Sequence, residues 1–243
     1  MEVVRDDDYA AFVKDKLWEL QKSKRREITA DFHVSELLAP RMAYWNRVEG
    51  EKPTDQSTGF FITGEAFHHV IQEAVGQQFA EQRLTLALKR LADRKVLGTA
   101  DLMALWLAEI KTSRKWTIPA FPDPEYVRQT GCYMAMSGRD EAYILVIFFV
   151  SGRKWNGKGS SSLEIVSWKL TSTEAERAEI LETMEETAVA LDQALELRNP
   201  ALVAPCAQWK CGQIYEKKLS NLCPHYEACQ PEGRYPQEVL LAL

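Results

Sequence analysis

The feature that most constrains this chain is a short run in which two carboxylates and an ammonium lie among apolar residues. Gly98-Thr99-Ala100-Asp101 is followed by Glu109-Ile110-Lys111, inside the largely apolar stretch 96–110. Charged side chains are costly to bury, so a run of this kind keeps them only where they are paired or serve a purpose.

Read as a β-hairpin, the run has a simple geometry. If the chain turns near Leu105, Asp101 lies directly across from Glu109, with Cβ atoms roughly 5 Å apart. Glu109 and Lys111 then share one face, while Ile110 points into the core.

Two carboxylates this close repel each other, so one is hard to ionise unless a cation lies between them. Carboxylate oxygens with room for water suit Mg²⁺ or Mn²⁺. The alternative is a surface hairpin with an ordinary Glu–Lys pair, because an Asp…Glu-x-Lys pattern also arises by chance. The stretch alone leaves both interpretations open.

Composition and charge narrow the class of protein. A chain of 243 residues can bury a sizeable core and suits one large α/β domain, or such a domain with an appendage. No run approaches the ~20 apolar residues of a membrane helix, and the acidic segment 1–8 lacks a signal-peptide core. We therefore expect a cytoplasmic protein that does not contact a membrane. The net charge of −5 gives no overall attraction to nucleic acid, so any DNA binding must come from a local basic cleft.

Hydrophobic periodicity and capping signals predict both helices and strands, with the strand 143–150 central in a sheet because it is apolar on both faces. Helices are expected over residues 1–28, from Ser35 as N-cap, over 64–89, over 125–137 and from the capping box at Thr173 to about Arg198. Besides the hairpin, strands are expected over 143–150 and 163–170, and a loop over 50–59. The chain divides into an N-terminal helical region (1–60), a core (61–200) and a cysteine-rich C-terminal segment that packs back on the core (201–243).

Three polar side chains on the predicted helices are candidates for a site. His68 lies at the edge of the apolar face of the helix 64–89, where it is either a structural histidine or a metal ligand. Gln129 and Tyr133 are four residues apart and therefore share one helix face. By themselves these two read equally well as an ordinary polar pair.

Four of the five cysteines crowd the C-terminal segment, with the spacing Cys206-x4-Cys211-x11-Cys223-x5-Cys229. Four thiols gathered in an apparently intracellular chain indicate a metal or cluster site rather than disulfides. Zinc sites usually have shorter Cys-x-x-Cys knuckles, whereas iron–sulfur clusters tolerate irregular spacing. Cys132 lies apart and is expected to be an ordinary buried thiol.

Four motifs stand in one order: Gly64-x3-His68, Gly98-Thr99-Ala100-Asp101, Glu109-Ile110-Lys111 and Gln129-x3-Tyr133. Together they resemble the RecB-type nucleases of the PD-(D/E)XK superfamily, over roughly residues 30–230. The resemblance implies an α/β restriction-endonuclease-like core, with a central mixed sheet flanked by helices. The activity it implies is that of a metal-dependent deoxyribonuclease that hydrolyses phosphodiester bonds. It also implies the site residues: His68, Asp101, Glu109 and the carbonyl of Ile110 as ligands of Mg²⁺ or Mn²⁺, Lys111 as the catalytic lysine, and Gln129 and Tyr133 as groups that hold the substrate strand or the lysine.

The cysteine segment is similar to that of CRISPR-associated RecB-like nucleases. These proteins carry one cysteine before the His motif and three near the C-terminus, which together hold a [4Fe–4S] cluster. Here Ala39 stands where the first cysteine would precede Pro-Arg. The resemblance implies a cluster on Cys211, Cys223 and Cys229, with Cys206 as the replacement ligand and Zn²⁺ as the alternative.

The expected function is an exonuclease that acts on single-stranded or frayed DNA ends. The alternatives are a single-strand or flap endonuclease, and a non-cutting DNA-end-binding module of a larger repair or CRISPR-type complex. DNA contacts are expected from four basic residues: Arg41, Arg153, Lys154 and Lys158. The hairpin tip 103–107 is apolar and has no turn-forming residue, so it is either covered by this chain or docks on a protein partner.

Overall fold

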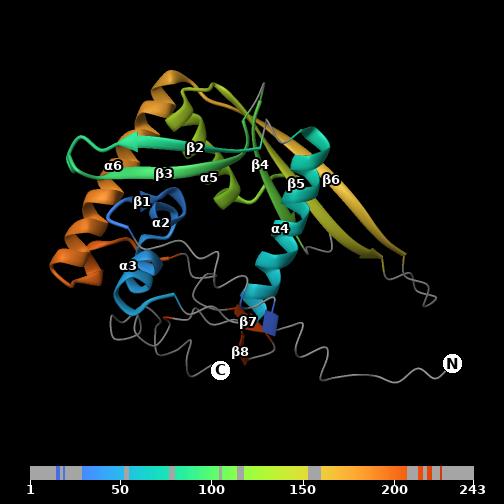
Figure 1. Cartoon of the computed structure of the whole chain (residues 1–243), viewed down its shortest axis with the longest axis horizontal. Helices are drawn as coiled ribbons and strands as arrows, with labels where there is room; N and C mark the ends of the chain where they lie inside the picture. The colour runs from blue at the N-terminus through green and yellow to red at the C-terminus, as the bar shows by residue number, and fades with distance from the viewer. Residues whose placement is uncertain are drawn as a thin grey trace.

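The protein is described from a computed structural model that covers residues 15, 16, 19, 29–51, 55–76, 80–103, 106–113, 118–152, 160–206, 213–215, 218–220 and 225. Within these residues the structure is a six-stranded mixed sheet with helices packed against it (Figure 1). This is the α/β class that the sequence predicts. None of the helices in this part of the chain combines the length and the apolar character needed to cross a bilayer.

The sheet has the order β1-β3-β4-β5-β6, with β2 paired to β3. Its strands are β1 (Phe32–His33), β2 (Ala80–Ala87), β3 (Lys95–Met103), β4 (Leu107–Ser113), β5 (Glu141–Gly152) and β6 (Ser160–Thr171). The helices are α2 (Val34–Leu38), α3 (Pro40–Glu49), α4 (Asp55–Val75), α5 (Pro124–Ser137), α6 (Glu174–Glu196) and the 3₁₀-helix η2 (Pro200–Leu202). A separate two-stranded sheet pairs β7 (Gln213–Tyr215) with β8 (Lys218–Ser220).

Strand β5 is the central strand that its apolar sequence predicts. It pairs in parallel with β4 and antiparallel with β6. Ile144, Val146, Ile147 and Phe148 are all at most 2 % exposed, although they lie on both faces of the strand. Both faces of the sheet are therefore covered at this point.

Helices α4 and α5 lie on opposite faces of β4. A Cβ atom built at Gly64 in α4 would lie 3.6 Å from Oγ1 of Thr112. In α5, the Tyr126 ring lies under the ammonium of Lys111, 5.7 Å from ring centroid to Nζ. Because Lys111 and Thr112 are consecutive, their side chains point to opposite faces, and so do the two helices. Figure 1 shows α4 crossing the sheet near β4 and β5.

Strands β3 and β4 form a fork rather than a long hairpin. They pair at Leu102–Ala108 and Met103–Leu107, beside the predicted turn. Further along, β4 continues against β5, while β3 pairs with β2 on one edge and with β1 at Val96 and Leu97 on the other. The divergence opens the sheet at the point where Asp101 and Glu109 lie.

Helices α5 and α6 close the main core, which they share with β1, α2 and α3. The predicted capping box at the start of α6 is confirmed. Thr173 Oγ1 accepts a hydrogen bond from the backbone N–H of Glu176 at 3.2 Å, and the Glu176 carboxylate accepts one from the backbone N–H of Thr173 at 2.7 Å.

The predicted helix over 64–89 is wrong at both ends. Helix α4 begins earlier, at Asp55, so it covers part of the predicted loop, and it ends at Val75. Residues 80–87 instead form β2, in which Leu84 is buried while Arg83 and Thr85 are exposed. Pairing with the whole length of β3 outweighs the helix propensity of this segment.

The start of α2 also differs from the prediction. His33, not Ser35, is the N-cap, and its backbone N–H donates to Oε2 of Glu36 at 2.8 Å. The helix predicted over residues 1–28 falls almost wholly outside the described residues.

Candidate functional site

The two carboxylates meet at the fork between β3 and β4. The strand pairing ends at Leu102–Ala108, one residue before Asp101 and Glu109, so these two carboxylates lie where the strands begin to diverge. Asp101 Oδ2 accepts a hydrogen bond from the backbone N–H of Ile110 at 2.7 Å. A side-chain oxygen of β3 therefore satisfies a backbone donor of β4 just beyond the end of the strand pairing.

Glu109 is buried, with 2 % of its surface exposed, and forms an ion pair with Lys111 through Oε1. Its second oxygen, Oε2, is buried without a hydrogen-bond partner among the described residues. Burial, reinforced by the charge of Asp101, raises the pKa of Glu109 to about 7 even though Lys111 opposes the shift.

Burial alone would lower the pKa of Lys111. The adjacent Glu109 and the more distant Asp101 outweigh this effect, so the pKa of Lys111 is raised. The lysine is therefore an ammonium at neutral pH.

Helix α4 supplies two side chains one turn apart. His68 Nδ1 lies 3.3 Å from Asp101 Oδ1, and Gln72 Nε2 donates a long hydrogen bond of 3.4 Å to the backbone oxygen of Asp101. Gln72 is 5 % exposed. It was not predicted as a site residue, although its spacing of four residues from His68 places the two on one helix face and could have identified it. Burial lowers the pKa of His68, but the hydrogen bond and charge of Asp101 outweigh it and the net shift is upward.

Helix α5 covers the other face of the fork. Gln129 Nε2 donates to Tyr133 Oη at 2.9 Å, so the predicted pair does share one face. The Tyr133 ring lies so close to Gly98 that a Cβ there would come within 2.9 Å of it. Tyr126, one turn before Gln129, was also missed, and its ring contacts the Lys111 ammonium.

The residues at the fork offer oxygen atoms that suit a divalent cation. Among the described residues no group of three or more His, Cys, Asp or Glu side chains is arranged as a ready metal site. Two observations nonetheless fit a cation: the orphaned Glu109 Oε2, and the second carboxylate at Asp101 beside it. The Lys111 ammonium pairs with Glu109, so a bound ion would share this carboxylate with the lysine. The donor set fits a hard cation that binds with water to complete its coordination.

Arg41, which the sequence predicts to contact DNA, is buried in the structure. It is 3 % exposed, and its Nε and Nη2 donate to the backbone oxygen of Val203 at 3.2 and 2.8 Å. A guanidinium held in this way links α3 to the segment after α6, which does not support a contact with DNA.

The remaining predicted residues are described only in part. Arg153, Lys154 and Lys158 lie outside the described residues, as do Cys211, Cys223 and Cys229. Cys206 is half-buried, and Cys132 is buried as predicted. At the hairpin tip Trp106 is 63 % exposed and meets Tyr143 edge to face, so a protein partner there stays a prediction.

Comparison with known proteins gives a fold likeness only. The crystal structure of SSO0001 matches 84 % of this chain and 91 % of its own, with 18 % identity and a TM-score of 0.55. An alkaline exonuclease (LHK-Exo) from Laribacter hongkongensis matches 70 % of this chain and 92 to 93 % of its own, with a TM-score of 0.44 at 16 % identity and of 0.42 at 15 % identity in its complex with dAMP. SSO0001 therefore shares the fold, whereas the two exonuclease structures are too distant to carry an argument. No protein-family model and no curated protein sequence matches the chain.

Proposed function

We propose that the chain is a divalent-metal-dependent deoxyribonuclease that acts on single-stranded or frayed DNA ends. The observation that carries the proposal is the fork, where two carboxylates and a lysine converge. One buried oxygen of Glu109 has no hydrogen-bond partner there among the residues that the structure describes. The order of the four sequence motifs supports the same function.

A divalent cation held here would supply an activated water and would polarise the scissile phosphate. Asp101 and Glu109 would hold the ion, with His68 on the side of α4. The Lys111 ammonium neutralises the negative charge that develops on the phosphate as the water oxygen bonds to phosphorus. The ester bond from phosphorus to the leaving oxygen then breaks. The attacking water gives up its proton to solvent, and the released oxygen takes a proton from solvent.

Tyr126 and the Gln129–Tyr133 pair have supporting roles in this scheme. The Tyr126 ring under Lys111 limits where the ammonium can move. The Gln129–Tyr133 hydrogen bond fixes the helix face that lies against β3 at Gly98. Both contacts keep the lysine and the carboxylates in one place while the strand binds.

The alternative of a non-cutting DNA-end-binding module is less favoured by the same observation. A buried carboxylate oxygen without a partner costs stability, of order 1–3 kcal/mol. A module that only binds DNA gains nothing from that cost, whereas a metal-dependent nuclease does.

We also propose that the four C-terminal cysteines hold a [4Fe–4S] cluster, or Zn²⁺ as the alternative. Two described points on this segment lie against the same helix, α3. Val203, just before Cys206, is bound by Arg41, and His225, between Cys223 and Cys229, lies 2.7 Å through Nε2 from Oδ1 of Asn46. One point before Cys206 and one between Cys223 and Cys229 are thus both held against α3.

The nuclease proposal is tested with end-labelled single-stranded DNA, Mn²⁺ or Mg²⁺, and a chelator control. Asp101→Asn and Glu109→Gln remove charge at constant size and are expected to reduce cleavage by several orders of magnitude. Asp93→Asn, at an exposed turn, is the matched control and should cut at the parental rate. Release of single nucleotides supports the exonuclease, and internal fragments support the endonuclease. If folded Asp101→Asn cuts as fast as the parent, the proposal is wrong.

A further inference from the structure

Helix α4 spans the fork between β3 and β4 with side chains that recur every four residues. Gly64, His68 and Gln72 share one face of the helix because of this spacing. Gly64 lies against Thr112 of β4, whereas His68 and Gln72 contact Asp101 of β3. The helix therefore bridges two strands at the point where they cease to pair with each other.

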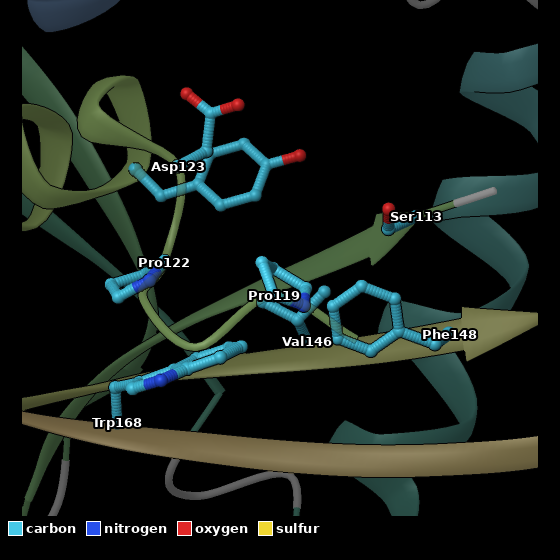
Figure 2. Close-up of a pocket in the computed structure, with 8 residues that line it drawn as sticks. Ser113, Pro119, Pro122, Asp123, Val146, Phe148 and Trp168 are labelled. Atoms are coloured by element: carbon cyan, nitrogen blue, oxygen red, sulfur yellow. The ribbon is translucent and has the colours of Figure 1, made fainter. Parts of the chain in front are cut away.

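On one side of the fork, β4 is held along its whole length. All seven of its residues pair in parallel with β5. At its far end Ser113 lines a small space together with Pro119 and Phe148. Figure 2 shows the loop that carries Pro119 lying over the strand that carries Phe148. Strand β4 is therefore a fixed wall of the site, because close packing leaves it little room to move.

On the other side, the pairing of β3 is interrupted at Asp101. The register with β2 includes the residues on either side, Ala100 and Leu102, but skips Asp101 itself. Glu81, which would lie opposite Asp101, has a φ of +32°, a positive value that L side chains seldom adopt. On the opposite edge, the pairing with β4 ends at Leu102. Among the described strands, Asp101 thus lies in a break on both edges of β3.

Gln72 contacts the main chain at this break. Its side chain is buried, and its Nε2 donates to the backbone oxygen of Asp101 at 3.4 Å. The carboxylate of Asp101 is held by other groups, since Oδ2 accepts from the backbone N–H of Ile110 and Oδ1 faces His68. The main chain and the side chain of this aspartate are therefore fixed separately.

We infer that Gln72 is a positioning residue of the site. Its amide fixes β3 at Asp101 and so sets the separation of the Asp101 and Glu109 carboxylates that would share one cation. The inference rests on the proposed function for the presence of that cation. Groups that orient a metal ligand without binding the ion change metal affinity by roughly 10- to 100-fold when they are replaced.

Gln72→Met tests this role, because it keeps the length of the side chain and removes the donor. Binding of Mn²⁺ to the protein without DNA is measured by isothermal titration calorimetry. The Kd for Mn²⁺ is expected to rise roughly tenfold. Gln72→Asn keeps the amide but withdraws it by one methylene, so it should weaken Mn²⁺ binding as well. The parental Kd in both folded variants would overturn the inference.

Arg41→Met is the matched control for a purely structural effect. Arg41 is also a buried donor to a backbone oxygen, but its acceptor is Val203 rather than a residue of the fork. This variant should lower the midpoint of thermal unfolding and keep the parental Kd for Mn²⁺. If Gln72→Met does the same, Gln72 only stabilises the fold and the inference is wrong.

Cleavage of single-stranded DNA gives a second measure of the role of Gln72. In Gln72→Met, kcat should fall at low Mn²⁺ and recover as the Mn²⁺ concentration is raised, while KM for DNA stays near the parental value. The reverse pattern, a higher KM with an unchanged kcat at every Mn²⁺ concentration, would contradict the positioning of a metal ligand.

Together these measurements separate the inference from the proposed function. Mn²⁺-dependent cleavage that requires Asp101, combined with the parental Kd in both Gln72 variants, leaves the nuclease proposal standing and overturns the role of Gln72. Weaker Mn²⁺ binding in the Gln72 variants, with no cleavage of any strand by the parent, supports the role of Gln72 and contradicts the proposed hydrolysis.

Discussion

At Gly98 the missing side chain is what allows α5 to lie against β3. A Cβ at this position would lie 2.9 Å from Cε1 of Tyr133 and 3.2 Å from Cγ2 of Val34. Neither neighbour has room to retreat, because Tyr133 is 5 % and Val34 is 1 % exposed. The glycine therefore decides how closely the Gln129–Tyr133 pair approaches the fork.

We expect Gly98→Ala to lower the free energy of unfolding by about 1–3 kcal/mol, as overpacking does, and to reduce cleavage because Tyr133 is displaced. Gly64→Ala is the matched control, since its Cβ would meet only Thr112 Oγ1 at an ordinary 3.6 Å. That change in a helix interior should raise the free energy of unfolding by up to about 1 kcal/mol. Urea denaturation measures both; equal effects of the two substitutions would contradict the contact at Gly98.

The orphaned oxygen of Glu109 gives a second prediction at the residue scale. A cation that binds only the folded state stabilises it in proportion to its occupancy. Mg²⁺ or Mn²⁺ should therefore raise the midpoint of thermal unfolding of the parent and of Asp93→Asn. The same ions should have little effect on Glu109→Gln, in which one anionic ligand is lost. An undiminished rise in Glu109→Gln would place the ion away from the fork.

At the scale of the elements, buried polar contacts join helices to distant segments. Arg41 at the start of α3 holds the carbonyl of Val203, which follows η2. Within α2, Glu36 accepts hydrogen bonds from Arg47 of α3 at 2.7 and 2.8 Å. These contacts fix α3 against both its neighbour and the end of the core.

Substitution of Arg41 distinguishes this role from a contact with DNA. Arg41→Met leaves a buried carbonyl without a donor and is expected to cost about 1–3 kcal/mol in unfolding free energy. Arg41→Lys keeps the charge but not the two-pronged donation, so its cost should be intermediate. DNA affinity, measured where both variants are folded, should match the parent. A selective loss of DNA binding with unchanged stability would restore the original prediction.

At the scale of the whole molecule, α3 is the meeting point of segments that are far apart in sequence. Besides Val203 it contacts His225, which is 1 % exposed and whose Nδ1 lies 3.3 Å from Oε2 of Glu49. A cluster on the cysteines around these two points would fasten the C-terminal segment to the core.

Protein prepared without air and loaded with iron is therefore expected to be brown and to absorb near ~400 nm. Cys223→Ser should remove the colour and the bound iron. Cys132→Ser, whose thiol is buried in α5 apart from the segment, should keep both. A colourless protein that releases zinc on thiol modification would favour Zn²⁺, and a protein that binds neither metal would contradict the cysteine site.

The sequence by itself determined the local parts of this protein. A strand period of two predicted Glu109 and Lys111 on one face, and the pattern of a hairpin predicted Asp101 close to Glu109. The helix period placed Gln129 beside Tyr133, and capping chemistry set the start of α6. Each of these follows from neighbours within a few residues, where backbone geometry leaves few choices.

Only the tertiary structure decided what meets at the fork. The divergence of β3 from β4 depends on β1, β2 and β5, and the strand at β2 exists because a long-range partner outweighs local helix propensity. Gln72 and Tyr126 lie at the site because α4 and α5 pack on opposite faces of one strand. Arg41 is buried because the backbone oxygen of Val203 accepts its hydrogen bonds inside the protein. Such contacts join residues far apart along the chain, and no local pattern records them.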